Sequence, residues 1–76
     1  MSTPIGAVVV GTGFGLFTHT RALREAGFEV RAFVGRDRAK TAARAAPLGI
    51  PLATDSLEDA LRDDAIRLVT VATPPH

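Results

Sequence analysis

Three glycines, Gly11, Gly13 and Gly15, occupy alternate positions directly after the apolar residues 8–10. Glycines at the end of a buried strand allow a tight turn, and the missing side chain lets a phosphate approach the backbone N–H groups. Where a helix begins at such a turn, its free N–H groups and positive dipole end favour an anion. The spacing therefore predicts a phosphate-binding turn, and a plain flexible turn is the alternative.

The glycine spacing matches the dinucleotide-binding fingerprint Gly-x-Gly-x-x-Gly in its first two positions. Gly11 and Gly13 fit the glycine that turns the chain and the glycine that approaches the pyrophosphate. The third position of the fingerprint falls on Leu16, and Gly15 is an additional glycine. The residues expected to hold a pyrophosphate, mostly by backbone N–H groups, are Gly11, Thr12, Gly13, Phe14 and Gly15.

A second candidate site lies about 20 residues further on, where dinucleotide-binding folds place the residue that contacts the adenosine ribose. An Asp or Glu there bonds the 2′-hydroxyl of NAD, whereas a nearby Arg accommodates the 2′-phosphate of NADP. The segment reads FVGRDR and places Gly35 and Arg36 at this point. We therefore predict that Arg36 contacts a 2′-phosphate and that NADP(H) is preferred over NAD(H). In the alternative, Asp37 reads the ribose of NAD, although Asp37 is also a good helix N-cap.

The hydrophobic pattern predicts the elements that position these residues. Apolar runs over 5–10, 30–34, 50–53 and 66–72 predict strands. The segments between them predict three helices: 14–26, ended by a left-handed Gly27, a second after Asp37, and a third capped by Asp55 or Ser56.

Each predicted helix carries a face of small or apolar residues. The inward-facing sets are Leu16, Thr20 and Leu23 in the first helix, Ala39, Ala42, Ala43 and Ala46 in the second, and Leu57, Ala60 and Leu61 in the third. Such faces predict packing of each helix against a sheet.

The alternation of strands and helices predicts parallel pairing through right-handed crossovers. The expected fold is a Rossmann-type α/β half-domain of three layers, with four parallel strands in the order 3-2-1-4 and helices on both faces. The first and fourth strands are then neighbours, and a ligand crevice opens at their carboxyl ends. Ala72, Thr73 and Pro74 end the fourth strand and reach the same crevice.

Composition limits the partners of the chain. Its 76 residues form one small domain at most, and the net charge of +1 comes from interspersed basic and acidic residues, so no nucleic-acid partner is expected. The apolar run 5–17 has no basic stretch before it and is too short to span a bilayer, so no membrane partner is expected either. With no cysteine in the sequence, we expect a cytoplasmic protein.

Two stretches, VVVGTGFGLFTHTRALREAGFEVRAFVGRD and LVTVATPPH, together with GIPLATDSLEDALRDDAI between them, resemble the amino-terminal domain of the Gfo/Idh/MocA oxidoreductases. The resemblance implies an NAD(P)-binding Rossmann domain whose glycine turn wraps the pyrophosphate and whose Ala72, Thr73 and Pro74 line the nicotinamide side. It implies a parent enzyme that transfers a hydride between the cofactor and a sugar, polyol or related CH–OH substrate. His19 matches a histidine frequent in the family, and we expect it to have a packing or surface role.

The family's proton-transferring residue is typically a lysine in a Glu-Lys-Pro motif, which this chain lacks. Its one lysine, Lys40, falls in the second predicted helix. We therefore expect residues 1–76 to be an incomplete Rossmann domain without a substrate domain, without a metal site and without a catalytic residue. The apolar run 66–72 would form an exposed edge strand, which also suggests a fragment. A missing carboxy-terminal domain or a homo-oligomer partner would complete the parent.

Three alternatives stay open. The chain could be a non-catalytic nucleotide-binding module that works with a partner chain, or a truncated remnant without function. It could also be a domain that binds S-adenosylmethionine, since Gly-x-Gly-x-Gly occurs in methyltransferases. Those domains usually carry an acidic residue two positions before the first glycine, where this chain has Val9.

Overall fold

The structure, a computed structural model, describes residues 4–11 and 14–72. These residues form a parallel four-stranded sheet in the order β3-β2-β1-β4, which confirms the predicted order. The strands are β1 (Gly6–Gly11), β2 (Glu29–Val34), β3 (Leu52–Thr54) and β4 (Ile66–Ala72). The helices are α1 (Phe14–Glu25), α2 (Arg38–Ala45), the 3₁₀ turn η1 (Ala46–Leu48) and α3 (Leu57–Ala60).

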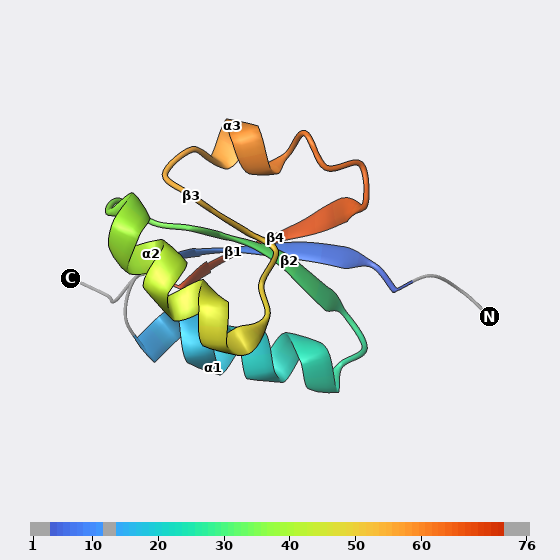
Figure 1. The fold of residues 1–76 in the computed structure, drawn as a ribbon. Helices are drawn as coiled ribbons and strands as arrows, with labels where there is room; N and C mark the ends of the chain where they lie inside the picture. The colour runs from blue at the N-terminus through green and yellow to red at the C-terminus, as the bar shows by residue number, and fades with distance from the viewer. Residues whose placement is uncertain (1–3, 12–13, 73–76) are drawn as a thin grey trace.

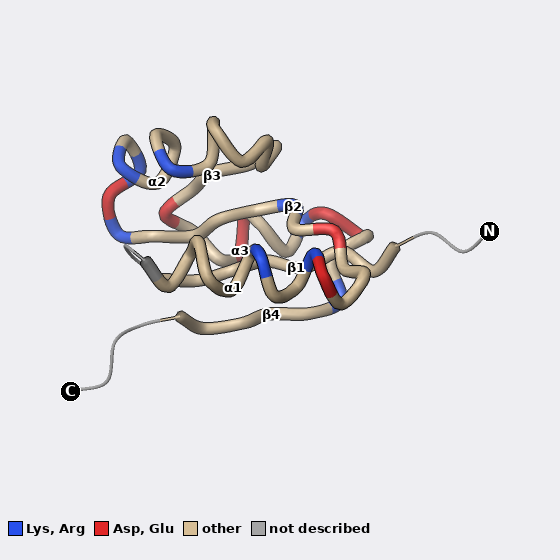
Figure 2. The backbone as a smooth tube through the Cα atoms, turned by 90° about the horizontal axis from the view of Figure 1, so that it is seen from below, with Lys and Arg blue, Asp and Glu red and all other residues tan. Residues whose placement is uncertain are grey.

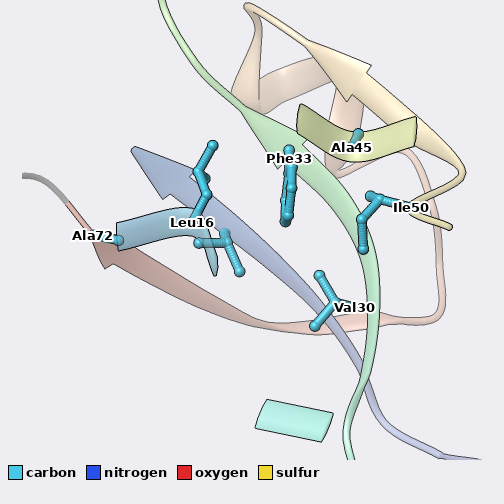
Figure 3. Close-up of a cluster of buried hydrophobic side chains, with 7 residues drawn as sticks. Leu16, Val30, Phe33, Ala45, Ile50 and Ala72 are labelled. Carbon is cyan, nitrogen blue, oxygen red and sulfur yellow. The ribbon is translucent and has the colours of Figure 1, made fainter. Parts of the chain in front are cut away.

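The helices make three layers with the sheet, as predicted: α1 and α2 cover one face and α3 covers the other (Figure 1). The two central strands, β1 and β2, are therefore buried on both sides, which explains their nearly continuous apolar sequences. The core on the side of α1 and α2 is built around Phe33, with Leu16, Ala45 and Ile50 packed about it (Figure 3). The smaller core on the other side contains Val8, Ala32, Val34 and Ala60.

Helix α1 has the predicted inner face and the predicted end. Leu16 and Thr20 are buried, and Leu23 is partly buried. Gly27 adopts a φ of +93°, and its N–H donates to the carbonyl of Arg24 at 3.1 Å. The N–H of Phe28 reaches the carbonyl of Leu23 at 2.9 Å, so the end of α1 is a Schellman motif.

The predicted inner face of α2 is wrong. The residues of this helix that are buried are Thr41 and Ala45, whereas the expected alanines are exposed: Ala39, Ala42, Ala43 and Ala46. Asp37 fixes where the helix begins, but the turn from β2 fixes its rotation, and this rotation directs the row of Thr41 and Ala45 to the sheet. The alanine stripe therefore faces solvent.

The third strand and the third helix also differ from expectation. The strand runs over Leu52–Thr54 rather than 50–53, and Ile50 is buried before the strand begins. Ser56 caps α3, since its Oγ accepts from the N–H of Asp59 at 3.2 Å. This helix is a single turn, so Ala60 reaches the core while the two expected leucines, Leu57 and Leu61, remain exposed. In the part of the chain that the structure describes, no helix is both long and apolar enough to cross a membrane.

Candidate functional site

The candidate site lies where β1 and β4 end side by side. These neighbours pair in parallel, and Gly11 at the end of β1 is in register with Ala72 at the end of β4. After β1 the chain crosses through α1 on one face of the sheet, whereas β4 is entered from α3 on the other face. In open α/β sheets, the ligand crevice forms at the carboxyl ends of strands at such a switch point.

Two of the predicted glycines bring α1 against the end of β4. A Cβ atom added to Gly11 would lie 2.7 Å from the carbonyl oxygen of Ala72. A Cβ atom added to Gly15 would lie 2.9 Å from the Cβ of Ala72 and closer still to its carbonyl oxygen. Real Cβ atoms essentially never come that close, so both positions need glycine. The first turn of α1 therefore sits directly on the end of β4.

This contact explains the departure from the dinucleotide fingerprint. The third glycine of the fingerprint allows close packing of helix and strand. Here Gly15 allows that packing, one residue earlier than the fingerprint expects. Leu16, at the fingerprint position, is instead buried in the core.

The start of α1 can receive an anion. Helix α1 begins at Phe14, and its first turn carries no acidic side chain that would compete for the free N–H groups. Four other predicted site residues, Thr12, Gly13, Thr73 and Pro74, lie outside the described residues. Thr12 follows Gly11 and Thr73 follows Ala72, and the structure brings Gly11 and Ala72 together.

The end of β2 lies beside Gly11. A Cβ atom added to the buried Gly35 would lie 3.1 Å from the carbonyl oxygen of Gly11. Arg36, the next residue, is exposed, and its guanidinium has no hydrogen bond or ion pair within the described ranges. Lys and Arg gather at the turn from β2 into α2 (Figure 2). Arg36 is therefore free to meet a ligand that extends from the glycine turn.

Asp37 is already engaged by its own helix. Its Oδ1 accepts from the N–H of Lys40 at 3.0 Å, which confirms the predicted N-cap of α2. Its carbonyl oxygen accepts from the N–H of Thr41 at 2.9 Å and from the Thr41 hydroxyl at 2.7 Å. The N-cap thus uses one carboxylate oxygen, and Oδ2 is the carboxylate oxygen of Asp37 that has no hydrogen bond among the described residues.

Sequence reasoning missed Thr41. This buried side chain packs against Gly35, and its hydroxyl oxygen stands where a Cβ of residue 35 would have to be. One signal was available: a threonine, with low helix propensity, stands in a helix made mostly of alanine and basic residues. His19, in contrast, is half-buried within α1, in keeping with the packing or surface role expected for it.

Comparison with known proteins agrees with this fold. The sequence model of the Gfo/Idh/MocA family, described as an oxidoreductase family with an NAD-binding Rossmann fold, matches residues 5–76. The protein named oxidoreductase cns1, from the fungus Cordyceps militaris, is 42% identical over 69 residues. That match covers 90% of this chain but only 9% of the fungal protein.

Two solved structures share the fold. One is GenD2 from gentamicin A biosynthesis in complex with NAD, with a TM-score of 0.82, 36% identity, and coverage of 97% of this chain and 21% of GenD2. The other is an NAD-binding oxidoreductase from Klebsiella pneumoniae, with a TM-score of 0.80 and 24% identity, which supports the fold alone. That match covers 99% of this chain and 22% of the chain of the Klebsiella protein. This chain therefore spans about a fifth of each solved relative.

Proposed function

The chain belongs to the Gfo/Idh/MocA family of oxidoreductases with an NAD-binding Rossmann fold, and on that premise we propose how it holds its cofactor. The dinucleotide lies along the carboxyl ends of β1, β2 and β4. The observation that carries this proposal is the contact of Gly11 and Gly15 with Ala72, which sets the start of α1 at the switch point of the sheet.

The backbone does most of the binding. In the proposal, N–H groups of Gly11, Thr12, Gly13, Phe14 and Gly15 hold the pyrophosphate. The end of β4, with Ala72, Thr73 and Pro74, borders the nicotinamide half. When bound, the nicotinamide supplies hydride transfer, and the chain's own groups bind and orient the cofactor. None of these residues is proposed to move a proton.

We propose that the whole enzyme is an NAD(P)-dependent oxidoreductase acting on a sugar, polyol or related CH–OH substrate. The family match and the name of the fungal relative support the oxidoreductase class. Residues 1–76 supply the cofactor-binding part, while a substrate-binding domain or a second copy of the enzyme supplies the groups for chemistry. A non-catalytic nucleotide-binding module would show cofactor binding without turnover in the whole protein.

We propose that the part of the site that binds the adenosine ribose favours NADP(H) over NAD(H). Three features support this: Gly35 offers no carboxylate, Asp37 is engaged as a cap, and the Arg36 guanidinium is free of partners among the described residues. A guanidinium fork suits a phosphate dianion well. GenD2 was solved with NAD, so this is the point at which we expect the present chain to differ from that relative.

Calorimetric titration of the 76-residue chain with NADP⁺ and NAD⁺ tests both proposals. We expect NADP⁺ to bind more tightly. Arg36→Ala should weaken NADP⁺ binding about tenfold to a hundredfold, the value of a charge-assisted hydrogen bond, and leave NAD⁺ binding within about twofold.

The matched control is Arg67→Ala, an exposed arginine near the opposite, amino end of β4. This variant should bind both cofactors like the unaltered chain. Tighter binding of NAD⁺, or NADP⁺ affinity unchanged by Arg36→Ala, would contradict the NADP preference. Binding of S-adenosylhomocysteine without binding of either dinucleotide would contradict the cofactor class.

A further inference from the structure

We propose that Thr41 is a specificity-determining positioning residue. Its hydroxyl occupies the space that the Cβ of a ribose-reading carboxylate would need at position 35. Because of Thr41, position 35 accommodates glycine but no larger residue. Arg36 is then the residue that contacts the 2′ substituent of the adenosine ribose. This inference rests on the proposed cofactor site and goes beyond it, because Thr41 itself is not proposed to touch the cofactor.

The Thr41 hydroxyl blocks a side chain at position 35 sterically. A Cβ atom built on Gly35 falls well inside 3.0 Å of the Thr41 hydroxyl oxygen, a separation that real Cβ atoms essentially never show. The Thr41 Cβ is 3.6 Å away, which is an ordinary contact. The Gly11 carbonyl oxygen is 3.1 Å away, a tight contact that requires this backbone atom to give by a few tenths of an ångström. The hydroxyl is therefore the main obstacle to a side chain at position 35.

The backbone of Gly35 does not explain why this residue is glycine. The described glycines with positive φ are Gly11, Gly27 and Gly49, and Gly35 is not among them. Residue 35 therefore does not have the left-handed φ that favours glycine. Position 35 therefore requires glycine because of the neighbouring Thr41 side chain, and not because of a left-handed φ.

The Thr41 hydroxyl cannot easily move away. Thr41 is only 4% exposed, and its hydroxyl donates to the carbonyl of Asp37 at 2.7 Å. A threonine in a helix has few rotamers, and this one is fixed by the hydrogen bond to the residue four positions earlier. Rotating it would leave a buried hydroxyl without a partner, which is costly.

The same contacts hold the loop that carries Arg36. On one side, the N–H of Gly35 donates to the carbonyl of Thr54 at 3.0 Å. On the other side, Asp37 is held by Thr41 and by the N–H of Lys40. Residue 36 therefore sits between two anchored residues, and a fixed backbone lowers the entropy that its side chain must lose on binding a phosphate.

The chemical consequence concerns the ribose. A carboxylate at position 35 would accept a hydrogen bond from a 2′-hydroxyl and repel a 2′-phosphate. While the Thr41 hydroxyl is present, that carboxylate cannot be accommodated. Gly35→Asp alone should therefore not make the chain selective for NAD. Selectivity for NAD should also require a smaller residue in place of Thr41.

A double-mutant cycle on the 76-residue chain tests this inference, with Tm and the ratio of NAD⁺ to NADP⁺ dissociation constants as readouts. Gly35→Asp alone should lower Tm by about 10 °C or more, as expected for overpacking in a small domain. Adding Thr41→Ala should recover most of that loss. The double variant should also shift the affinity ratio toward NAD⁺ by about tenfold, the value of one hydrogen bond to a charged group.

Thr20→Ala is the matched control. Thr20 is 2% exposed in α1, and its hydroxyl donates to the carbonyl of Leu16, also four residues earlier, at 2.6 Å. Combined with Gly35→Asp, this control should lower Tm further and recover nothing.

Several results would overturn the role of Thr41. These are an unchanged Tm in Gly35→Asp, equal recovery by Thr20→Ala, or a recovered double variant with an unchanged affinity ratio. If the unaltered chain bound neither dinucleotide, the proposed function would fail instead, and the Tm cycle would still decide the steric claim.

Discussion

Arg31 and Asp63 join distant parts of the chain at the amino end of the sheet. The Arg31 Nε donates to Asp63 Oδ2, and its Nη1 donates to Glu29 Oε1 at 2.7 Å. Asp63 Oδ1 accepts from the N–H of Ala65 at 3.0 Å. The hydrogen bond from Arg31, followed by that from Ala65, holds the pKa of Asp63 below its usual value. This pair fastens the connection between α3 and β4 onto β2.

The lowered pKa predicts a pH dependence of stability. A carboxylate whose pKa is depressed by folding stabilises the native state above its unfolded pKa, about 4. That stabilisation is lost as the pH falls through the folded pKa. Asp63→Asn should therefore lower Tm at pH 7, and its deficit relative to the unaltered chain should shrink below about pH 4. Thermal unfolding followed by circular dichroism from neutral to acid pH measures this.

Asp64→Asn is the control for that experiment. Asp64 is exposed and forms no hydrogen bond or ion pair within the described part of the chain. The Asp64→Asn variant should therefore have the same Tm as the unaltered chain at neutral pH. A deficit in Asp63→Asn that stays constant from neutral to acid pH would show that the contribution is not ionic.

At the scale of elements, the two glycines at the ends of α1 have different functions. Gly15 allows contact with Ala72, whereas a Cβ added to Gly27 would meet nothing within 4 Å. Gly27 is instead required by its φ of +93°. The first glycine therefore sets where the helix docks, and the second only sets where it ends.

Replacing each glycine by alanine separates these functions. Gly15→Ala should destabilise the fold by about 1–3 kcal/mol, because α1 must move off the end of β4. Gly27→Ala should cost about 1 kcal/mol of backbone strain. Denaturant unfolding measures both costs. We expect NADP⁺ affinity to fall about tenfold in Gly15→Ala, the value of one lost phosphate hydrogen bond, and to stay unchanged in Gly27→Ala. Equal affinities in the two variants would contradict a role for the α1 start in binding.

The strands and their order could be predicted from sequence because alternating apolar runs and capped helices leave few topologies. The inner face of α2 could not, because Asp37 fixes the start of the helix but not its rotation. Thr41 was missed because the rotation of α2 decides that this side chain meets Gly35. That meeting is a tertiary contact between a helix and the loop before it, which a local pattern does not reveal. At the site, Gly11 and Ala72 meet as the predicted topology requires. The cofactor-binding roles of all the predicted site residues stay predictions.

At the scale of the whole molecule, the two edges of the sheet are unequal. Strand β3 has three residues, whereas β4 has seven and pairs with β1 on one side. Val69 and Val71 of β4 are 42% and 61% exposed. They are in register with Val8 and Val10 of β1, so they share the face of the sheet that carries α3. A long, apolar edge invites pairing with another chain.

Val71→Lys should therefore reduce self-association of the 76-residue chain, because a lysine at an edge strand opposes edge-to-edge pairing. Sedimentation velocity over a range of concentrations measures the effect. Leu52→Lys, an exposed residue of the short edge strand β3, is the control and should change association less. A monomeric unaltered chain at all concentrations would contradict the prediction.

Because every strand runs in the same direction, the amino ends of the strands lie on one side of the sheet and the carboxyl ends on the other. Strand β1 begins at Gly6, beside Ala65, while it ends at Gly11, beside Ala72. The start of β1 thus lies a full strand length from the proposed cofactor crevice. A domain immobilised through the start of β1 would therefore turn the proposed crevice toward solution, an arrangement suited to a surface-bound sensor of dinucleotides.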